Sequence, residues 1–364
     1  MLKSKFHYQL ALCYILRLLR PFSTLHRLDL NITSPDFTPT MNRQTITYAN
    51  HQIPLECDVY SSPAYPSNTP AFLFFHSGGL VGGARNCVPP WLVQVCLQRQ
   101  WPLISASYRL LPQANGACLL EDVEAAYEFA RKWGQGEERP VIVGGSSAGF
   151  FCAAMVAHHL QPQPIALLSI TGIPTFRHPF FNSSTLISPE PFTKAQMQKY
   201  LDEPVSVGSE HVADSIFYPD SLTETGAKKA GYERPSPTAR PSDGNDGLSR
   251  GCLYDYFVHE NTFVPMLDSY DPGYEWATTH PEGSKFAQWP TTILIQGDSD
   301  PDVDADVAIQ TAKNLGPKKA RLFIAKGQSH LFEAASFLED KGLGMDAVRL
   351  AIKELDNTLS QVYH

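Results

Sequence analysis

Residues 140–157 read PVIVGGSSAGFFCAAMVA, and this stretch decides the fold of the chain. Its β-branched start predicts a short strand, and its apolar end predicts a buried helix. Between them lies Gly145-Ser146-Ser147-Ala148-Gly149, a G-x-S-x-G sequence in the strand–turn–helix context that makes the central serine a nucleophile. Amides at the start of the helix would point at an oxyanion formed there, and the amide of Ala148 is the expected donor. A Gly/Ser-rich turn without chemistry is the alternative, and three further segments decide against it.

Apolar, β-rich runs recur on both sides of this stretch, with helical patterns between them. The expected strands are 45–48, 57–60, 71–75, 103–107, 141–143, 165–170, 292–295 and 321–324, and the expected helices besides the one after Ser147 are 91–97, 119–133, 303–315 and 345–359. The first two strands suit an antiparallel hairpin. The later, near-continuous apolar runs are typical of strands covered on both faces, as in a parallel sheet. Alternating strands and helices predict a doubly wound α/β sheet.

One long region breaks this alternation. Residues 175–290 show no strand signals, but contain a helical piece at 193–201, a polar segment at 223–250 and then several aromatic residues. Loops of this length are seldom idle in a compact domain. We therefore predict an insertion over the carboxyl edge of the sheet, where open α/β sheets bind ligands, with residues 223–250 a candidate for disorder.

Composition limits the class of protein. The 364 residues are enough for one large α/β domain with an insertion or for two domains, and 43% apolar with 18% charged residues is typical of a globular chain. A net charge of −8 without a basic tract argues against nucleic acid as a partner. The cysteines are scattered, form no C-x-x-C pair, and predict free thiols in a reducing compartment and no zinc site. They are Cys13, Cys57, Cys87, Cys96, Cys118, Cys152 and Cys252.

The N-terminal segment carries an apolar run at residues 8–19, preceded by Lys3 and Lys5. The residues after Arg20 offer no small-residue cleavage site, and the run is too short to span a bilayer. We expect a helix that packs on the body of the protein and can touch a membrane surface. The sequons at Asn31 and Asn182 are weak evidence for secretion, so the expected location is cytoplasmic.

Three more segments follow expected strands and carry chemistry. His76-Ser77-Gly78-Gly79 is poor in side chains, so its amides can approach a substrate carbonyl. We predict Gly78 and Gly79, with Ala148, as the oxyanion hole. A flexible glycine turn is the alternative.

The other two segments supply an acid and a base. Residues 296–304 read QGDSDPDVD, and a carboxylate at this strand end can orient a histidine. Asp300 has the best position, Asp298 and Asp302 are the alternatives, and Asp304 suits the first turn of a helix. His330 lies in the loop after the last strand, which gives the chain order Ser…Asp…His of the nucleophile-elbow hydrolases. We therefore predict the triad Ser147, Asp300 and His330.

At this point the chain resembles the α/β-hydrolases, and within them the hormone-sensitive-lipase-like "fold-3" esterases, with a looser likeness to fungal members from secondary metabolism. The likeness covers about residues 70–170 and 290–360. Family motifs map onto 76–79 (usually H-G-G-G), 107–112 (usually D-Y-R-L-A-P), Glu121-Asp122, 145–149 (usually G-D-S-A-G), Asp300-Pro301 and His330. Ser77 replaces a glycine of the oxyanion motif, and Ser146 replaces an acidic residue beside the nucleophile.

The resemblance implies an α/β-hydrolase fold with an eight-stranded, mostly parallel sheet flanked by helices. Residues 41–174 and 291–364 would form the catalytic domain, with a cap from residues 1–40 and from the insertion 175–290 after strand 6. It also implies a family that often forms homodimers.

The expected activity is a carboxylesterase-like serine hydrolase that cleaves an ester or lactone through an acyl-enzyme, without metal or organic cofactor. The substrate would be a small acyl ester or a polyketide-like molecule, because the aromatic insertion suits a bulky flat ligand. Open alternatives are an arylformamidase-like amide hydrolase, and a thioesterase, acyl transferase or cyclase of a polyketide pathway. Outside enzymes, the alternative is a ligand receptor on the same fold, as the gibberellin receptors are. Substrate-binding residues cannot be named from the sequence.

Overall fold

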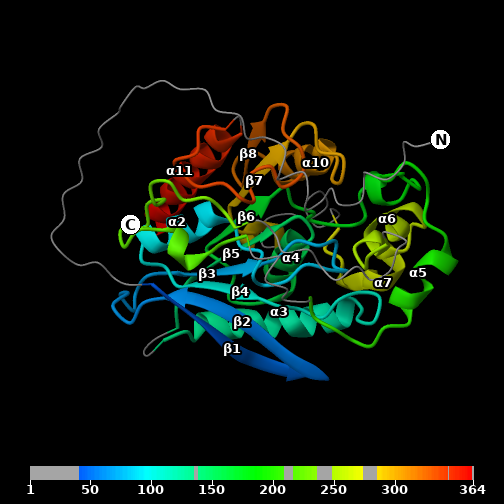
Figure 1. Ribbon diagram of the computed structural model, residues 1–364, viewed down its shortest axis with the longest axis horizontal. Helices are drawn as coiled ribbons and strands as arrows, with labels where there is room; N and C mark the ends of the chain where they lie inside the picture. Colours follow the sequence, from blue (N-terminus) through cyan, green and yellow to red (C-terminus); the bar gives the residue numbers. More distant parts are fainter. Residues whose placement is uncertain are drawn as a thin grey trace.

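The computed structural model describes residues 41–134, 138–208, 216–235, 248–273, 285–342 and 344–362. One eight-stranded sheet runs through it in the order β1-β2-β4-β3-β5-β6-β7-β8 (Figure 1). The strands are β1 (Asn42–His51), β2 (Ile53–Ser61), β3 (Ala71–Phe75), β4 (Leu103–Ala106), β5 (Val141–Ser146), β6 (Ala166–Ile170), β7 (Thr292–Gly297) and β8 (Ala320–Ala325). This confirms the predicted α/β fold and its mostly parallel sheet.

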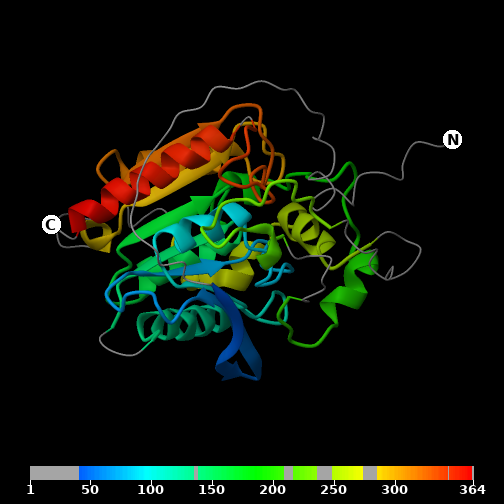
Figure 2. The ribbon, with the colours of Figure 1, turned by 60° about the vertical axis from the view of Figure 1, so that its left-hand side comes forward.

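The antiparallel part of the sheet is confined to one edge. β1 pairs with β2, and β2 pairs with β4, in antiparallel register, whereas every pair from β4 to β8 is parallel. The hairpin of β1 and β2 projects beyond the body of the molecule (Figure 2). Because the strands from β3 to β8 run the same way, the loops after β3, β5, β7 and β8 all leave from one edge of the sheet.

Helices cover both faces of the sheet, as the unbroken apolar strands require. Alternate residues of β3 divide between two cores, with Leu73 and Phe75 on one side and Phe72 and Phe74 on the other. The first core contains residues of α3 (Gly116–Arg131), α4 (Gly149–His159) and α10 (Ala305–Leu315). The second contains residues of α2 (Pro90–Gln98) and α11 (Met345–Val362), and Figure 2 shows α11 lying along β7 and β8.

In its described residues, the region between β6 and β7 consists of short helices joined by turns and loops. It contains the short turns η2 (Pro179–Phe181), η4 (Pro219–Ser221) and η5 (Asp268–Tyr270) and the helices α5 (Lys194–Leu201), α6 (Cys252–His259), α7 (Phe263–Leu267) and α9 (Lys285–Gln288). α5 begins with a capping box, in which the Thr193 hydroxyl and the Gln196 side chain satisfy each other's backbone amides. Figure 1 shows α5, α6 and α7 together at one end of the sheet.

Two expectations fall partly or wholly outside the described residues. The apolar run at 8–19 and the N-terminal cap segment lie outside them, as do residues 236–247 of the candidate disordered segment. The described part of that segment forms turns, with an isolated bridge between Leu222 and Lys228. Of the helices in the described ranges, none offers the length and the apolar run that crossing a bilayer would need.

Candidate active site

Ser147 lies on a strained turn between β5 and α4. Its φ is +52°, a left-handed conformation that non-glycine residues rarely adopt. Hydrogen bonds hold the turn from both sides, because the Ser147 amide donates to Ile170 O (2.9 Å) and its carbonyl accepts from the Ile173 amide (3.0 Å). The side chain is only 5% exposed. This is the geometry of a nucleophile elbow.

The two glycines of the elbow lie where the neighbouring backbone leaves no space for a side chain. A Cβ on Gly145 would lie 2.2 Å from the carbonyl carbon of Gly149, and one on Gly149 would lie 2.1 Å from the carbonyl oxygen of Phe75. Distances this short leave no room for any side chain. They also show that the start of α4 packs directly against the end of β3, where the His76–Gly79 segment begins.

That segment, residues 76–83, is called the oxyanion loop below. Gly78 and Gly79 have φ values of +122° and +65°, and the Gly78 carbonyl accepts from the amides of Val81 (3.0 Å) and Gly82 (2.9 Å). No hydrogen bond within the described residues uses the amides of Gly78, Gly79 or Ala148. Three donors near the nucleophile therefore remain free for a ligand.

His76 and Ser77 support the oxyanion loop. Nδ1 of His76 donates to the Ser77 carbonyl (2.8 Å), and the imidazole stacks on the Tyr108 ring at 4.3 Å. Burial lowers the pKa of His76 to about 4, so the ring is neutral at physiological pH. Serine can replace glycine at position 77 because the hydrogen bond from His76 uses only the backbone carbonyl of this residue. The Ser146 hydroxyl is buried, and no described residue is its hydrogen-bond partner.

The acid and the base meet across two strands. Nδ1 of His330, after β8, lies 2.8 Å from Oδ2 of Asp300, after β7. Asp300 is fixed in turn, because its Oδ1 accepts from the amides of Asp302 (3.0 Å) and Val303 (2.9 Å). Its Oδ2 also accepts from Nε2 of Gln296 (3.0 Å), a fully buried residue at the end of β7 to which the sequence assigned no role.

The neighbouring aspartates have other partners. Asp298 accepts from the Gly327 amide (2.5 Å), and Asp304 caps α10 by accepting from the Asp306 amide (2.8 Å). Asp302 offers its backbone carbonyl to the hydroxyl of Tyr254 (2.7 Å). The structure therefore brings Asp300 to His330, and neither Asp298 nor Asp302 hydrogen-bonds to that imidazole.

The electrostatics of this pair favour a charged imidazole. Burial by itself lowers the pKa of His330, but the charge of Asp300 and its hydrogen bond outweigh burial and raise the pKa to about 9. Ser147 and His330 make no hydrogen bond with each other in the described structure. A contact between nucleophile and base is often long without substrate and shortens when substrate binds.

Glu333 is a neighbour that sequence reasoning missed. Its side chain is fully buried, and neither carboxyl oxygen has a hydrogen-bond partner among the described residues. Burial raises its pKa to about 7, while the charge of His330 acts in the opposite direction. Its position three residues after His330 was the only sequence signal, and that spacing does not indicate burial.

A candidate metal cluster lies elsewhere and does not suit a metal. His51, Glu121 and Asp122 have potential ligand atoms within 4.8 Å of one another. The guanidinium of Arg109, only 2% exposed, already binds both carboxylates, with Nη2 2.7 Å from Asp122 Oδ1. A cation at this point would have to displace Arg109 and face its charge. The cluster is built around the buried Arg109–Asp122 salt bridge, and the 2.8 Å contact between His51 Nδ1 and Asp122 Oδ1 joins β1 to α3.

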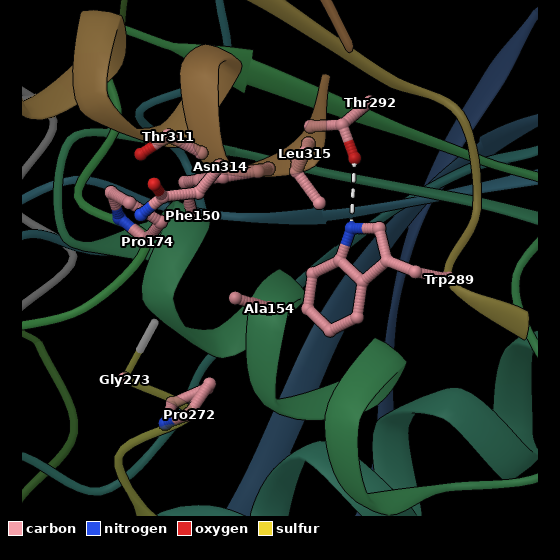
Figure 3. A pocket seen from close by; sticks show the side chains of 10 residues that line it. All are labelled: Phe150, Ala154, Pro174, Pro272, Gly273, Trp289, Thr292, Thr311, Asn314 and Leu315. Atoms are coloured by element: carbon pink, nitrogen blue, oxygen red, sulfur yellow. Dashed lines mark hydrogen bonds between the residues drawn. The ribbon is translucent and has the colours of Figure 1, made fainter. Parts of the chain in front are cut away.

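A small pocket between α4 and α10 is also separate from the site (Figure 3). Its lining includes Phe150, Ala154, Leu315 and Trp289, whose indole donates to the Thr292 hydroxyl (3.0 Å). The cavity volume is about 10 Å³, enough for a single water molecule. The described residues that line it include no carboxylate, imidazole, amine or thiol.

The comparisons with known proteins agree with this architecture. A family model described as an alpha/beta hydrolase fold matches residues 72–250. An α/β-hydrolase superfamily protein from Enterococcus faecalis has a similar structure, with a TM-score of 0.60 and 14% identity over 88% of this chain and 99% of that one. Carboxyl esterase 2 of the mycorrhizal fungus Tuber melanosporum has a TM-score of 0.53 and 14% identity over 89% of both chains. The chain has the α/β-hydrolase fold, as its motifs predict.

Similarity in sequence to individual proteins is local. A probable carboxylesterase M8 of Phoma sp. is 37% identical over 67 residues, which are 18% of this chain and 21% of that protein. Lipase 2 of a Moraxella strain is 34% identical over 94 residues, which are 25% and 22% of the two chains. An AB hydrolase superfamily protein of Schizosaccharomyces pombe is 35% identical over 99 residues, 26% and 29% of the two. The matched parts thus span less than a third of each of these relatives.

Proposed function

We propose that this protein is a serine hydrolase that cleaves a carboxylic ester or lactone through an acyl-enzyme. The observation that carries the proposal is the 2.8 Å hydrogen bond between His330 and Asp300 at the sheet edge where Ser147 occupies its strained turn. The carboxylesterase and lipase named among the relatives support the same class of reaction.

In the proposed first step, Nε2 of His330 takes the proton from the Ser147 hydroxyl as its oxygen attacks the acyl carbon. The Asp300 bond to Nδ1 keeps the proton there and leaves Nε2 free as the base. The free amides of Gly78, Gly79 and Ala148 would bind the developing oxyanion, and removal of one such donor typically costs about 2.7–4 kcal/mol. Collapse expels the alcohol, which takes its proton from His330.

In the second step, His330 activates water, which attacks the acyl carbon and releases the acid and Ser147. All the proton transfers use groups of this chain, so the proposal requires no cofactor. We expect turnover to survive treatment with EDTA.

The residues of the insertion 175–290 indicate which class of substrate to test first. Two of the aromatic residues that the sequence offered as a wall for a flat ligand, Phe257 and Phe263, are packing residues, because they are 3% and 0% exposed. Tyr274 and Trp276 lie outside the described residues. Tyr254 and Tyr256 remain half-buried. A small or medium acyl ester is therefore the first substrate class to test, ahead of a bulky polyketide.

A fluorophosphonate probe tests the proposal directly. Wild-type protein should be labelled on Ser147, located by peptide mass spectrometry, and should hydrolyse p-nitrophenyl esters. Ser147→Ala should lose both properties, with Ser183→Ala, an exposed serine, as the matched control. Turnover of formyl-kynurenine above that of all esters would indicate the formamidase alternative. An unlabelled wild-type protein would indicate a receptor.

A further inference from the structure

Tyr254 touches both halves of the candidate site from the insertion. It belongs to the first turn of α6, more than a hundred residues from Ser147 in the sequence. A Cβ added to Gly79 would lie 2.6 Å from Cδ2 of Tyr254, so the phenol ring rests directly on the oxyanion loop. At its other end, the hydroxyl donates to the Asp302 carbonyl at 2.7 Å. One side chain therefore spans the oxyanion loop and the acid loop, residues 298–303.

The acid loop connects Tyr254 to His330 through hydrogen bonds. The peptide units of Asp302 carry both contacts, since its carbonyl accepts from Tyr254 and its amide donates to Oδ1 of Asp300 at 3.0 Å. Oδ2 of the same carboxylate lies 2.8 Å from Nδ1 of His330. Three hydrogen bonds, joined through the backbone of Asp302 and the carboxylate of Asp300, thus link the phenol to the imidazole.

The first turn of α6 is itself held in place. Nε of Arg250 donates to the Val81 carbonyl in the oxyanion loop, and Nη2 donates to the Leu111 carbonyl, both at 2.8 Å. The Tyr254 ring packs against the fully buried Phe263, with ring centroids 5.8 Å apart. Because these contacts fix the helix, the phenol has little freedom to follow a loop that moves.

We propose that Tyr254 is a positioning residue that sets the oxyanion loop and the acid loop at a fixed separation. The proposal rests on the function proposed above, and it makes the first turn of α6 a structural part of the catalytic apparatus. The ring limits how far Gly79 can move, and the hydroxyl holds the peptide that orients Asp300.

Two variants separate these contributions. Tyr254→Phe keeps the ring on Gly79 and removes only the bond to Asp302, whereas Tyr254→Ala removes both. Tyr256→Phe, two residues along the same helix, is the matched control. For Tyr254→Phe we expect kcat on a p-nitrophenyl ester to fall about three- to tenfold with KM unchanged, the usual range for one hydrogen bond. In Tyr254→Ala, kcat should fall further and KM should also rise.

Hydrogen exchange of the backbone amides gives a readout that does not depend on activity. Tyr254→Phe should speed exchange at Asp302 and Val303, which donate to Asp300, and leave Val81 and Gly82 unchanged. Tyr254→Ala should speed exchange at all four. If it fails to fold, Tyr254→Phe alone decides.

The two proposals fail in different ways. Active wild-type protein whose Tyr254→Phe variant matches Tyr256→Phe in kcat and in exchange would overturn the role of Tyr254 and leave the hydrolase intact. Equal ester turnover by wild type and Ser147→Ala would overturn the hydrolase, and with it any catalytic meaning of faster exchange in the acid loop.

Discussion

Nδ1 of His330 lies 2.8 Å from Oδ2 of Asp300, although the two residues follow different strands of the sheet. β7 and β8 are parallel neighbours, paired from Thr292 with Ala320 to Gly297 with Ala325. The loops after them are locked together, because the Ser299 amide donates to the Gln328 carbonyl at 3.0 Å. The sheet therefore fixes the base and its acid before any substrate arrives.

This pair sets the expected pH dependence. The pKa of His330 is raised to about 9, and the imidazole acts as a base only when it is unprotonated. Activity should therefore be low below this pKa, and kcat/KM for an ester should rise with pH through an apparent pKa of about 9. Stopped-flow or steady-state rates measured from about pH 6 to about pH 10, in steps of about half a pH unit, define this ascending limb of the pH profile. A limb centred at the ordinary histidine value of 6.5 would contradict the assignment.

Glu333 should shift that limb. Its buried carboxylate is one of the charges that raise the pKa of His330. Glu333→Gln removes the charge, so the ascending limb of kcat/KM should move to lower pH. Glu190→Gln, at an exposed site, is the control and should leave the limb in place. An unchanged limb in Glu333→Gln would show that Glu333 does not influence the base.

The identity of the acid can be tested among the neighbouring aspartates. Asp300→Asn keeps the shape of the side chain but offers His330 the wrong partner, and loss of such a carboxylate typically lowers kcat about 10⁴-fold. Asp298→Asn, whose carboxylate holds the Gly327 amide, should cost less than about tenfold. Steady-state rates on one ester compare the two. A larger loss of kcat in Asp298→Asn than in Asp300→Asn would show that Asp300 is not the acid of the triad.

The elbow glycine Gly149 should tolerate no side chain. In Gly149→Ala the added methyl would lie 2.1 Å from the Phe75 carbonyl, so backbone must shift and the free energy of unfolding should fall by about 1–3 kcal/mol. Gly342→Ala is the control, because nothing lies within 4 Å of its Cβ position. Urea unfolding measures both. Equal stability of the two variants would mean that the elbow packs differently.

The buried salt bridge between Arg109 and Asp122 should matter for stability more than for chemistry. Asp122 is fully buried and also accepts from the Arg109 amide at 2.9 Å. Breaking a buried pair typically costs about 3–5 kcal/mol, so Asp122→Asn should lower the free energy of unfolding by an amount of this order. Glu128→Gln on the same helix removes a partly exposed carboxylate that pairs with Lys132 and Arg131, and it should change the free energy of unfolding by no more than about 1 kcal/mol. Comparable losses in the two would contradict the account of this cluster.

The sheet was predictable because its strands are covered on both faces. The continuous apolar runs at 71–75 and 141–143 match β3 and β5, and the interruption between β6 and β7 was visible as a long stretch without them. The tight turn at Ser147 was equally visible, because its flanking glycines leave space that no other residue can leave.

Contacts made by distant side chains were not predictable in this way. Nothing in the sequence around Tyr254 shows that its ring meets Gly79, because that contact depends on how the insertion packs. The aromatic residues of the insertion suggested a ligand wall, but aromatic residues in a sequence do not distinguish a ligand wall from a core, and Phe263 belongs to the core. Burial of Glu333 depends in the same way on tertiary packing.

A rapid-quench measurement of the acyl-enzyme tests the central claim most directly. Protein mixed with p-nitrophenyl acetate and quenched with acid within the first turnover should carry one acetyl group on the peptide that contains Ser147. Ser147→Ala should carry none and release no burst of p-nitrophenol. Full turnover without an adduct, or an adduct on another residue, would contradict the account.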